Sequence, residues 1–242
     1  MGPIAKAAGA VKAQLAKSQT ESPTATPDSE PRIVYRFGNE PKDVLVRAGI
    51  PARYRGARLK DFPDLDEGSI DWSRGGFFLQ GNPGIGKTYL AAALAARRLR
   101  QDHPWTLAQI QEPDGHDENV QTVIYAEDTV GWISAPELLL KIRATFGGSA
   151  TETEAQVVQR YVGFRLLVLD DLGAERVTDW SASTLYLIIS KRDAELRDTI
   201  ITSNASIGDI AKWEPRIASR VASMATIKLP DVDRRLTRRA TA

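Results

Sequence analysis

Residues 81–88 read Gly81-Asn82-Pro83-Gly84-Ile85-Gly86-Lys87-Thr88 and fit the pattern G-x-x-x-x-G-K-[ST] at every fixed position. A short apolar run at residues 77–79 precedes this loop, and strong helix formers fill residues 88–100 after it. Glycines let backbone N–H groups converge on phosphate oxygens, and the first turn of the following helix adds unpaired N–H groups and a positive dipole end. We therefore predict a phosphate-binding loop between a buried strand and a helix.

The side chains of this loop indicate its ligand. Lys87 can reach the β- and γ-phosphates of a nucleoside triphosphate, and the Thr88 hydroxyl can bind Mg²⁺. We expect ATP with Mg²⁺ as the ligands. The residues expected to bind the nucleotide are Gly81, Asn82, Pro83, Gly84, Ile85, Gly86, Lys87, Thr88 and the next helical residue, Tyr89.

A second apolar run, at residues 164–169, ends in two acids, Asp170 and Asp171. A buried strand of this kind places its carboxylates at the carboxyl edge of the sheet, where ligands of α/β proteins bind. We expect Asp170 to hold Mg²⁺ and Asp171 to orient or deprotonate the attacking water. Asp171 is one methylene shorter than a glutamate, so the alternative is that it caps the following turn. Glu175 is a further candidate for the base.

A third apolar run, at residues 199–202, is followed by Asn204. This position suits contact with the γ-phosphate or the attacking water. The alternative is that Asn204 is a turn residue, as asparagine often is after a strand.

The remaining pattern alternates strands with helices. We expect helices at 134–146, 180–195 and 217–224, strands at 122–125 and 225–229, and a surface loop at 101–120. This alternation predicts an α/β fold with a parallel sheet covered by helices on both faces.

The N-terminal residues differ in composition from the rest. Residues 4–16 have apolar residues at helical spacing, and residues 18–31 are rich in Ser, Thr, Pro and Glu. We expect a short amphipathic helix at 1–17, a flexible linker at 18–43 and one ATPase domain at 44–242. The net charge of +1 excludes a coat of basic charge, although four arginines cluster at residues 234–239. The chain has no cysteine, no apolar run of 18 residues and no signal-peptide pattern, so we expect a cytoplasmic protein without membrane contact.

Several stretches, in order along the chain, resemble the DnaC/IstB-like AAA+ ATPases, the bacterial and phage helicase loaders and transposition helpers. Besides the phosphate loop, these stretches are 50–55 (IPARYR), 170–175 (DDLGAE), 185–186 (LY), 202–204 (TSN) and 216–221 (RIASRV). The resemblance covers about residues 44–236 and implies a RecA-like P-loop NTPase fold. That fold would have a five-stranded parallel sheet between helices and no full C-terminal lid domain.

The resemblance also implies roles for single residues. Asn204 matches sensor 1, and Arg220 matches the arginine finger, with Arg216 as its rival one helical turn earlier. A finger implies a self-oligomer whose ATP site is completed by a neighbouring subunit. Arg235 would be sensor-2-like, although Asp231 replaces the usual glycine of that motif.

The same resemblance places a single-stranded DNA contact on the helix at 134–146, with Lys141, Arg143 and Phe146. Cations that track phosphates beside an aromatic ring suit such binding. The alternative is an amphipathic helix with solvated cations.

Three functions remain open at this point. The first is an ATPase that loads a replicative helicase onto single-stranded DNA. The second is an IstB-like helper that recruits a transposase. The third is a nucleotide-switched interaction module with little hydrolysis. The short N-terminus, without the cysteines that ligate zinc in many loaders, leaves the contact with a helicase unassigned.

Overall fold

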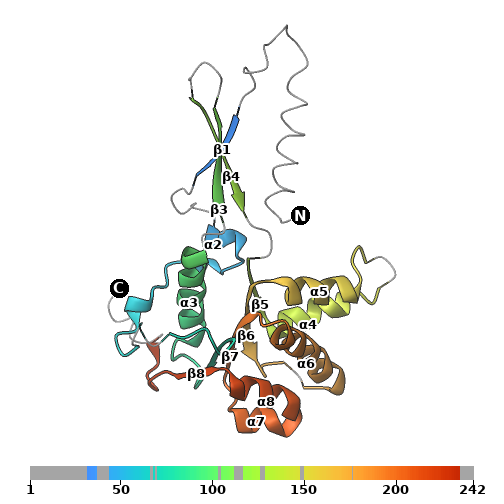
Figure 1. The fold of residues 1–242 in the computed structure, drawn as a ribbon. Coiled ribbons are helices and arrows are strands. Elements are labelled where there is room, and N and C mark those ends of the chain that lie inside the picture. The colour runs from blue at the N-terminus through green and yellow to red at the C-terminus, as the bar shows by residue number, and fades with distance from the viewer. Residues whose placement is uncertain are drawn as a thin grey trace. The chain divides into compact units, whose positions relative to one another are not determined.

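The phosphate loop follows the strand β2 (Gly76–Gln80), which lies inside a five-stranded sheet of strand order β5-β6-β7-β2-β8 (Figure 1). Every neighbouring pair is parallel. The other strands are β5 (Val130–Ser134), β6 (Leu166–Leu172), β7 (Asp198–Ser203) and β8 (Ala225–Lys228). The computed structural model describes residues 32–36, 44–65, 68, 70–102, 105–111, 117–125, 129–147, 150–175 and 177–234.

Helices pack on this sheet. Those predicted at 88–100, 134–146, 180–195 and 217–224 are present, and the helices at 154–163 and 207–213 were not predicted. The helix that leaves the phosphate loop is α3 (Lys87–Asp102), and the short α2 (Val44–Arg47) lies earlier in the chain, before the single turns η1 (Ala52–Tyr54) and η2 (Leu59–Asp61). The others are α4 (Ala135–Ala144), α5 (Glu154–Gly163), α6 (Asp179–Ala194), α7 (Ile207–Trp213) and α8 (Pro215–Ser223).

One apolar core joins the sheet to the helices α4 to α8. Phe78, Leu167 and Ile201 contribute to it from the strands, and all three are fully buried. The buried leucines of α3, Leu90 and Leu94, do not belong to that cluster. Because successive strand residues point to opposite faces, the sheet buries apolar residues on both. The predicted α/β fold with a covered parallel sheet is confirmed.

Local signals position the helix ends. The hydroxyl of Ser134 accepts from the N–H of Glu137, as its place before the Ala-Pro-Glu start predicts. Thr153, Thr178 and Ser206 each begin a capping box. The caps at Ser134 and Thr178 begin the helices predicted at 134–146 and 180–195, whereas those at Thr153 and Ser206 begin helices that were not predicted.

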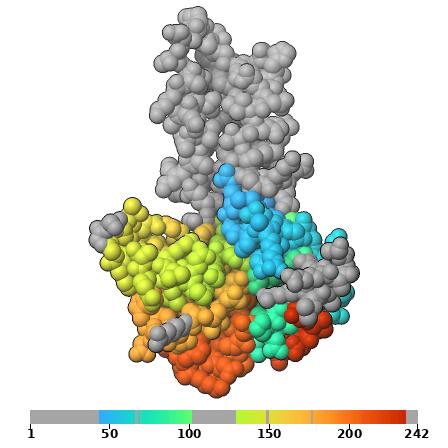
Figure 2. All heavy atoms as spheres, turned by 180° about the vertical axis from the view of Figure 1, so that it is seen from behind, coloured from blue at the N-terminus to red at the C-terminus, as the bar shows by residue number. Residues whose placement is uncertain are grey.

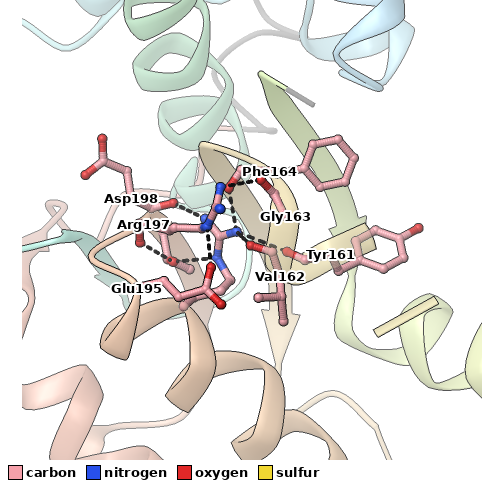
Figure 3. Close-up of polar contacts among 9 residues, drawn as sticks. Tyr161, Val162, Gly163, Phe164, Glu195, Arg197 and Asp198 are labelled. Carbon is pink, nitrogen blue, oxygen red and sulfur yellow. Dashed lines mark hydrogen bonds and ion pairs between the residues drawn. The ribbon is translucent and has the colours of Figure 1, made fainter. Parts of the chain in front are cut away.

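Arg192, near the end of α6, is fully buried, and the acceptors of its hydrogen bonds are one hydroxyl and four backbone carbonyls. Its guanidinium donates to the carbonyl oxygens of Tyr161 (3.0 Å), Val162 (2.9 Å) and Phe164 (2.7 Å), to that of Asp198 and to the hydroxyl of Thr199. The carbonyls of the first three converge where α5 ends (Figure 3). The cation thus satisfies the last carbonyls of α5 and faces the negative end of its dipole. Burial lowers the pKa of Arg192 to about 9.

A separate three-stranded antiparallel sheet has the order β1-β3-β4. Its strands are β1 (Arg32–Arg36), β3 (Trp105–Gln111) and β4 (Asp117–Tyr125). Of the described residues, 32–36, 44, 100–102, 105–111 and 117–125 belong to one compact unit, and the others belong to a second. Both the loop predicted at 101–120 and the linker predicted across 32–36 are therefore wrong where these strands lie. The pairing of β1 with β3 joins distant parts of the chain, which no local pattern indicates. β3 and β4 are consecutive strands, so their pairing is a local feature that sequence reasoning missed.

The helix predicted at 1–17 lies outside the described residues, as does the rest of the linker at 18–31 and 37–43. Within the described part of the chain, no helix is both long and apolar enough to cross a membrane.

Candidate functional site

Lys87 begins α3 and is buried, and its ammonium group joins two chain segments. Its Nζ donates to the carbonyl oxygens of Gly81 (2.7 Å) and Asn82 (2.9 Å) and to Oδ1 of Asn204 (2.8 Å). The phosphate loop after β2 and the residue after β7 therefore meet, because β2 and β7 are neighbours in the sheet. Asn204 lies at the site that the sequence predicted for it, held by the loop cation.

Asp170 and Thr88 meet on the other side of the loop. The Thr88 hydroxyl donates to Oδ1 of Asp170 (3.1 Å), and the Thr202 hydroxyl donates to the same oxygen (2.6 Å). Thr202 is fully buried in β7. Sequence reasoning did not single it out, although a hydroxyl in an otherwise apolar strand was a usable signal. Thr202 orients the carboxylate from the side.

Asp171 sits at an irregularity in the pairing of β6 with β7, between Leu169 and Leu172. Its φ of 56° lies in the left-handed region, which few residues other than glycine adopt. Its N–H donates to the Thr202 hydroxyl (2.9 Å). Bulges of this kind re-aim side chains beside functional sites, so Asp171 stays a candidate to orient the attacking water.

The electrostatics favour a cation beside Asp170. Burial raises the pKa of the Asp170 carboxyl, the hydrogen bond from Thr202 opposes this, and the charge of Asp171 adds to it. A divalent cation would offset the cost of keeping this carboxylate ionised. A hydroxyl and one carboxylate are a set that Mg²⁺ uses when nucleotide phosphates supply further oxygens. Among the described residues, no group of three His, Asp or Glu side chains could hold a metal ion. Thr88 and Asp170 thus fit Mg²⁺ shared with a nucleotide.

Glu175 follows on the loop after β6. Its Oε2 accepts from the N–H of Gly173 (3.0 Å), and its buried Oε1 has no hydrogen bond among the described residues. Burial raises the pKa of this carboxyl. Because one buried oxygen of this carboxylate accepts no hydrogen bond from the described residues, Glu175 stays an alternative to Asp171 as the base.

Residues 230–234, which we call the strap, lie across the phosphate loop. Nδ2 of Asn82 donates to both oxygens of Asp231 (2.9 and 3.0 Å), and the N–H of Arg234 donates to the carbonyl of Gly84 (3.0 Å). In this stretch the resemblance implied a nucleotide contact for Arg235, which lies outside the described residues. Asp231, Asp233 and Arg234 contact or approach the loop instead.

The tyrosine of the predicted nucleotide set, Tyr89, contacts the turn η2, which Arg234 of the strap also contacts. Its hydroxyl donates to Oδ2 of Asp61 (2.7 Å), and its ring packs near Phe62. Tyr89 therefore connects α3 to the turn η2.

Arg220 and Arg216 both stack on Tyr186 of α6, with guanidinium carbons 5.0 and 4.1 Å from the ring centroid. Glu214 holds Arg216 through two hydrogen bonds (2.8 and 2.7 Å), whereas Arg220 lies 3.7 Å from Asp193. The hydrogen bonds of both arginines are to residues of α8 and its cap. Among the described residues, neither arginine forms a hydrogen bond or an ion pair with the phosphate loop, so the structure does not join them to the site within one chain.

The helix α4 turns Leu138, Leu139 and Ile142 into the core. Its outer side exposes Leu140 (63%) and Phe146 (57%), and α4 lies on the yellow-green surface of Figure 2. Trp180 of α6 supports this side, edge-on to Phe146 and with the Arg143 guanidinium 5.0 Å over its ring. Lys141 pairs with Glu137 (3.2 Å). Leu138, Leu139 and Ile142 thus face the core, whereas Arg143, Phe146 and Trp180 form an aromatic–cation cluster outside it.

Comparison with family models and with curated proteins gave no match. Solved structures do match. The DnaI crystal structure has a TM-score of 0.51 at 23% identity over 74% of this chain and 94% of that one. The DnaC helicase loader has a TM-score of 0.53 at 20% identity, covering 74% and 99%. A structure of the replication initiator DnaA bound to AMPPCP and single-stranded DNA has a TM-score of 0.52 at 15% identity, covering 74% and 50%.

At these identities the likeness concerns the fold. The strand order, the phosphate loop after β2 and the acids after β6 agree with it. The chain therefore has the α/β fold of the DnaI, DnaC helicase loader and DnaA structures, with the five-stranded parallel sheet that the sequence predicts.

Proposed function

We propose that this chain binds and hydrolyses ATP with Mg²⁺ and uses the cycle to load a replicative helicase onto single-stranded DNA. One observation carries the nucleotide part: Lys87, Thr88, Asp170 and Asn204 converge from three chain segments at the phosphate loop. A triphosphate would replace the carbonyl and amide acceptors of the Lys87 ammonium. Backbone N–H groups of the loop would hold its oxygens.

The chain's own residues supply the remaining steps. Thr88 and Asp170 would hold Mg²⁺, which neutralises charge on the phosphates. Asp171 would orient a water molecule for attack on the γ-phosphate and accept its proton, and Asn204 would position the same water. Arg220 would stabilise the charge of the transition state in a neighbouring subunit's site.

The proposed contact with single-stranded DNA is inferred from the residues on the outer side of α4 and just after it. Phe146 offers a ring face for a base, and Arg143 and Lys141 offer cations for the flanking phosphates. The proposal that the partner is a helicase is supported only by the fold that this chain shares with DnaC and DnaI.

The test is the ATPase rate of the full chain alone, with single-stranded DNA and with duplex DNA of the same sequence. We expect hydrolysis that responds to single strands more than to duplex, and a Phe146→Ala variant that keeps basal hydrolysis but loses this response. Stimulation by duplex alone would instead favour the transposition helper. Tight ATP binding without turnover under every condition would favour the nucleotide-switched module. Absence of nucleotide binding would refute the proposal.

A further inference from the structure

The strap brings two carboxylates to the phosphate loop, although the ligand expected there is an anion. Asp231 accepts two hydrogen bonds from the Asn82 amide, so its charge is tied to the second residue of the loop. The Arg234 N–H to Gly84 carbonyl bond fixes the strap on the same loop three residues further along.

Asp233 approaches the loop even more closely. A Cβ added at Gly84 would lie 2.6 Å from Oδ1 and 2.9 Å from Oδ2 of Asp233. The carboxylate therefore fills the space that a side chain at position 84 would need. Gly84 has a φ of 92°, a backbone conformation that favours glycine.

The strap also brings a cation to the loop, because a Cβ added at Gly86 would lie 3.1 Å from Cδ of Arg234. The Arg234 guanidinium donates to the carbonyl of Asp61 (3.0 Å) and lies over the Phe62 ring, 4.7 Å from its centroid. These contacts anchor the strap to the turn η2, while the carboxylates of Asp231 and Asp233 lie at Asn82 and Gly84 of the loop. Lys87 is the loop's own cation, and its ammonium already has three acceptors.

We propose that Asp231 and Asp233 set the nucleotide selectivity of the loop by lowering its affinity in proportion to the negative charge of the phosphate chain. This inference rests on the proposed nucleotide binding and adds the residues that tune it. Like charges a few ångströms apart repel, and exposed acids do so in a salt-dependent manner. The triphosphate is penalised most, the diphosphate less and the monophosphate least.

The experiment measures the dissociation constants of ATP, ADP and AMP by calorimetry at constant Mg²⁺, in low and in high salt. The test variant is Asp231→Asn with Asp233→Asn. The control is Glu137→Gln with Glu154→Gln, which removes the same charge from exposed positions on α4 and α5. We expect the test variant to bind ATP roughly three- to tenfold more tightly, to gain less for ADP, and to lose most of the gain in high salt.

The inference would be overturned if the test variant gained the same affinity for all three nucleotides, showed unchanged affinity or bound them more weakly. Weaker binding would show that the strap stabilises the conformation of the loop. A gain of the same size in the control would also overturn it, since net charge would then be the cause. The proposed function fails separately, if neither the native chain nor the test variant binds any nucleotide. Binding by the test variant alone would support the inference in its strongest form.

Discussion

The ammonium of Lys87 is the cation that the phosphate loop offers to a nucleotide, and the loop carbonyls and Asn204 hold it in place. Lys87→Ala removes this charge. Charged hydrogen bonds contribute about 1.5–3 kcal/mol each, so we expect ATP affinity to fall by at least about tenfold. Calorimetry with ATP measures this, with the exposed Lys212→Ala as the control. Unchanged ATP affinity would show that this loop does not bind the nucleotide.

Two carboxylates compete for the role of base, also at the residue scale. Asp171 lies on the bulge next to Asp170, and Glu175 has a buried oxygen without a hydrogen bond among the described residues. We expect Asp171→Asn to keep ATP affinity and to slow single-turnover hydrolysis by about a hundredfold or more, and Glu175→Gln to slow it less. The reverse order of the two rates would transfer the role to Glu175.

At the scale of elements, Arg192 joins the end of α5 to the start of β7. Arg192→Met keeps a similar volume but leaves several buried carbonyls unpaired, each at a cost of about 1–3 kcal/mol. We expect the free energy of unfolding to fall by about 3 kcal/mol or more in urea denaturation. Arg197→Met, which removes a partly exposed cation from the same turn, should cost less than about 1 kcal/mol. A similar loss in both variants would show that the burial of Arg192 is not what matters.

At the scale of the whole molecule, Arg220 contacts Arg216 and Tyr186 and, among the described residues, forms no hydrogen bond with the phosphate loop of its own chain. The resemblance nevertheless implies a role for Arg220 at an ATP site. We expect Arg220→Ala and Lys87→Ala to be inactive as single proteins and to regain part of the ATPase rate when mixed. The mixture forms sites with an intact loop and an intact finger in neighbouring subunits. A mixture that stays inactive under conditions where the native chain assembles would contradict completion between subunits. Arg216→Ala in the same mixture separates the two arginines.

Short-range patterns were enough for the phosphate loop, the helix start at Ser134 and the acids at the end of β6, because these features depend on neighbours in the chain. Tertiary structure alone brought Lys87 to Asn204 and Asp231 to Asn82, across 117 and 149 residues. Those meetings follow from the sheet order β6-β7-β2-β8, which places the carboxyl ends of distant strands side by side. The pairing of β3 with β4 is local, and it was missed because the polar residues 101–120 were interpreted as a loop. Only the tertiary structure decided β1, because β1 and β3 pair across a long separation and the pairing energy of a strand lies in its partner rather than in its own residues.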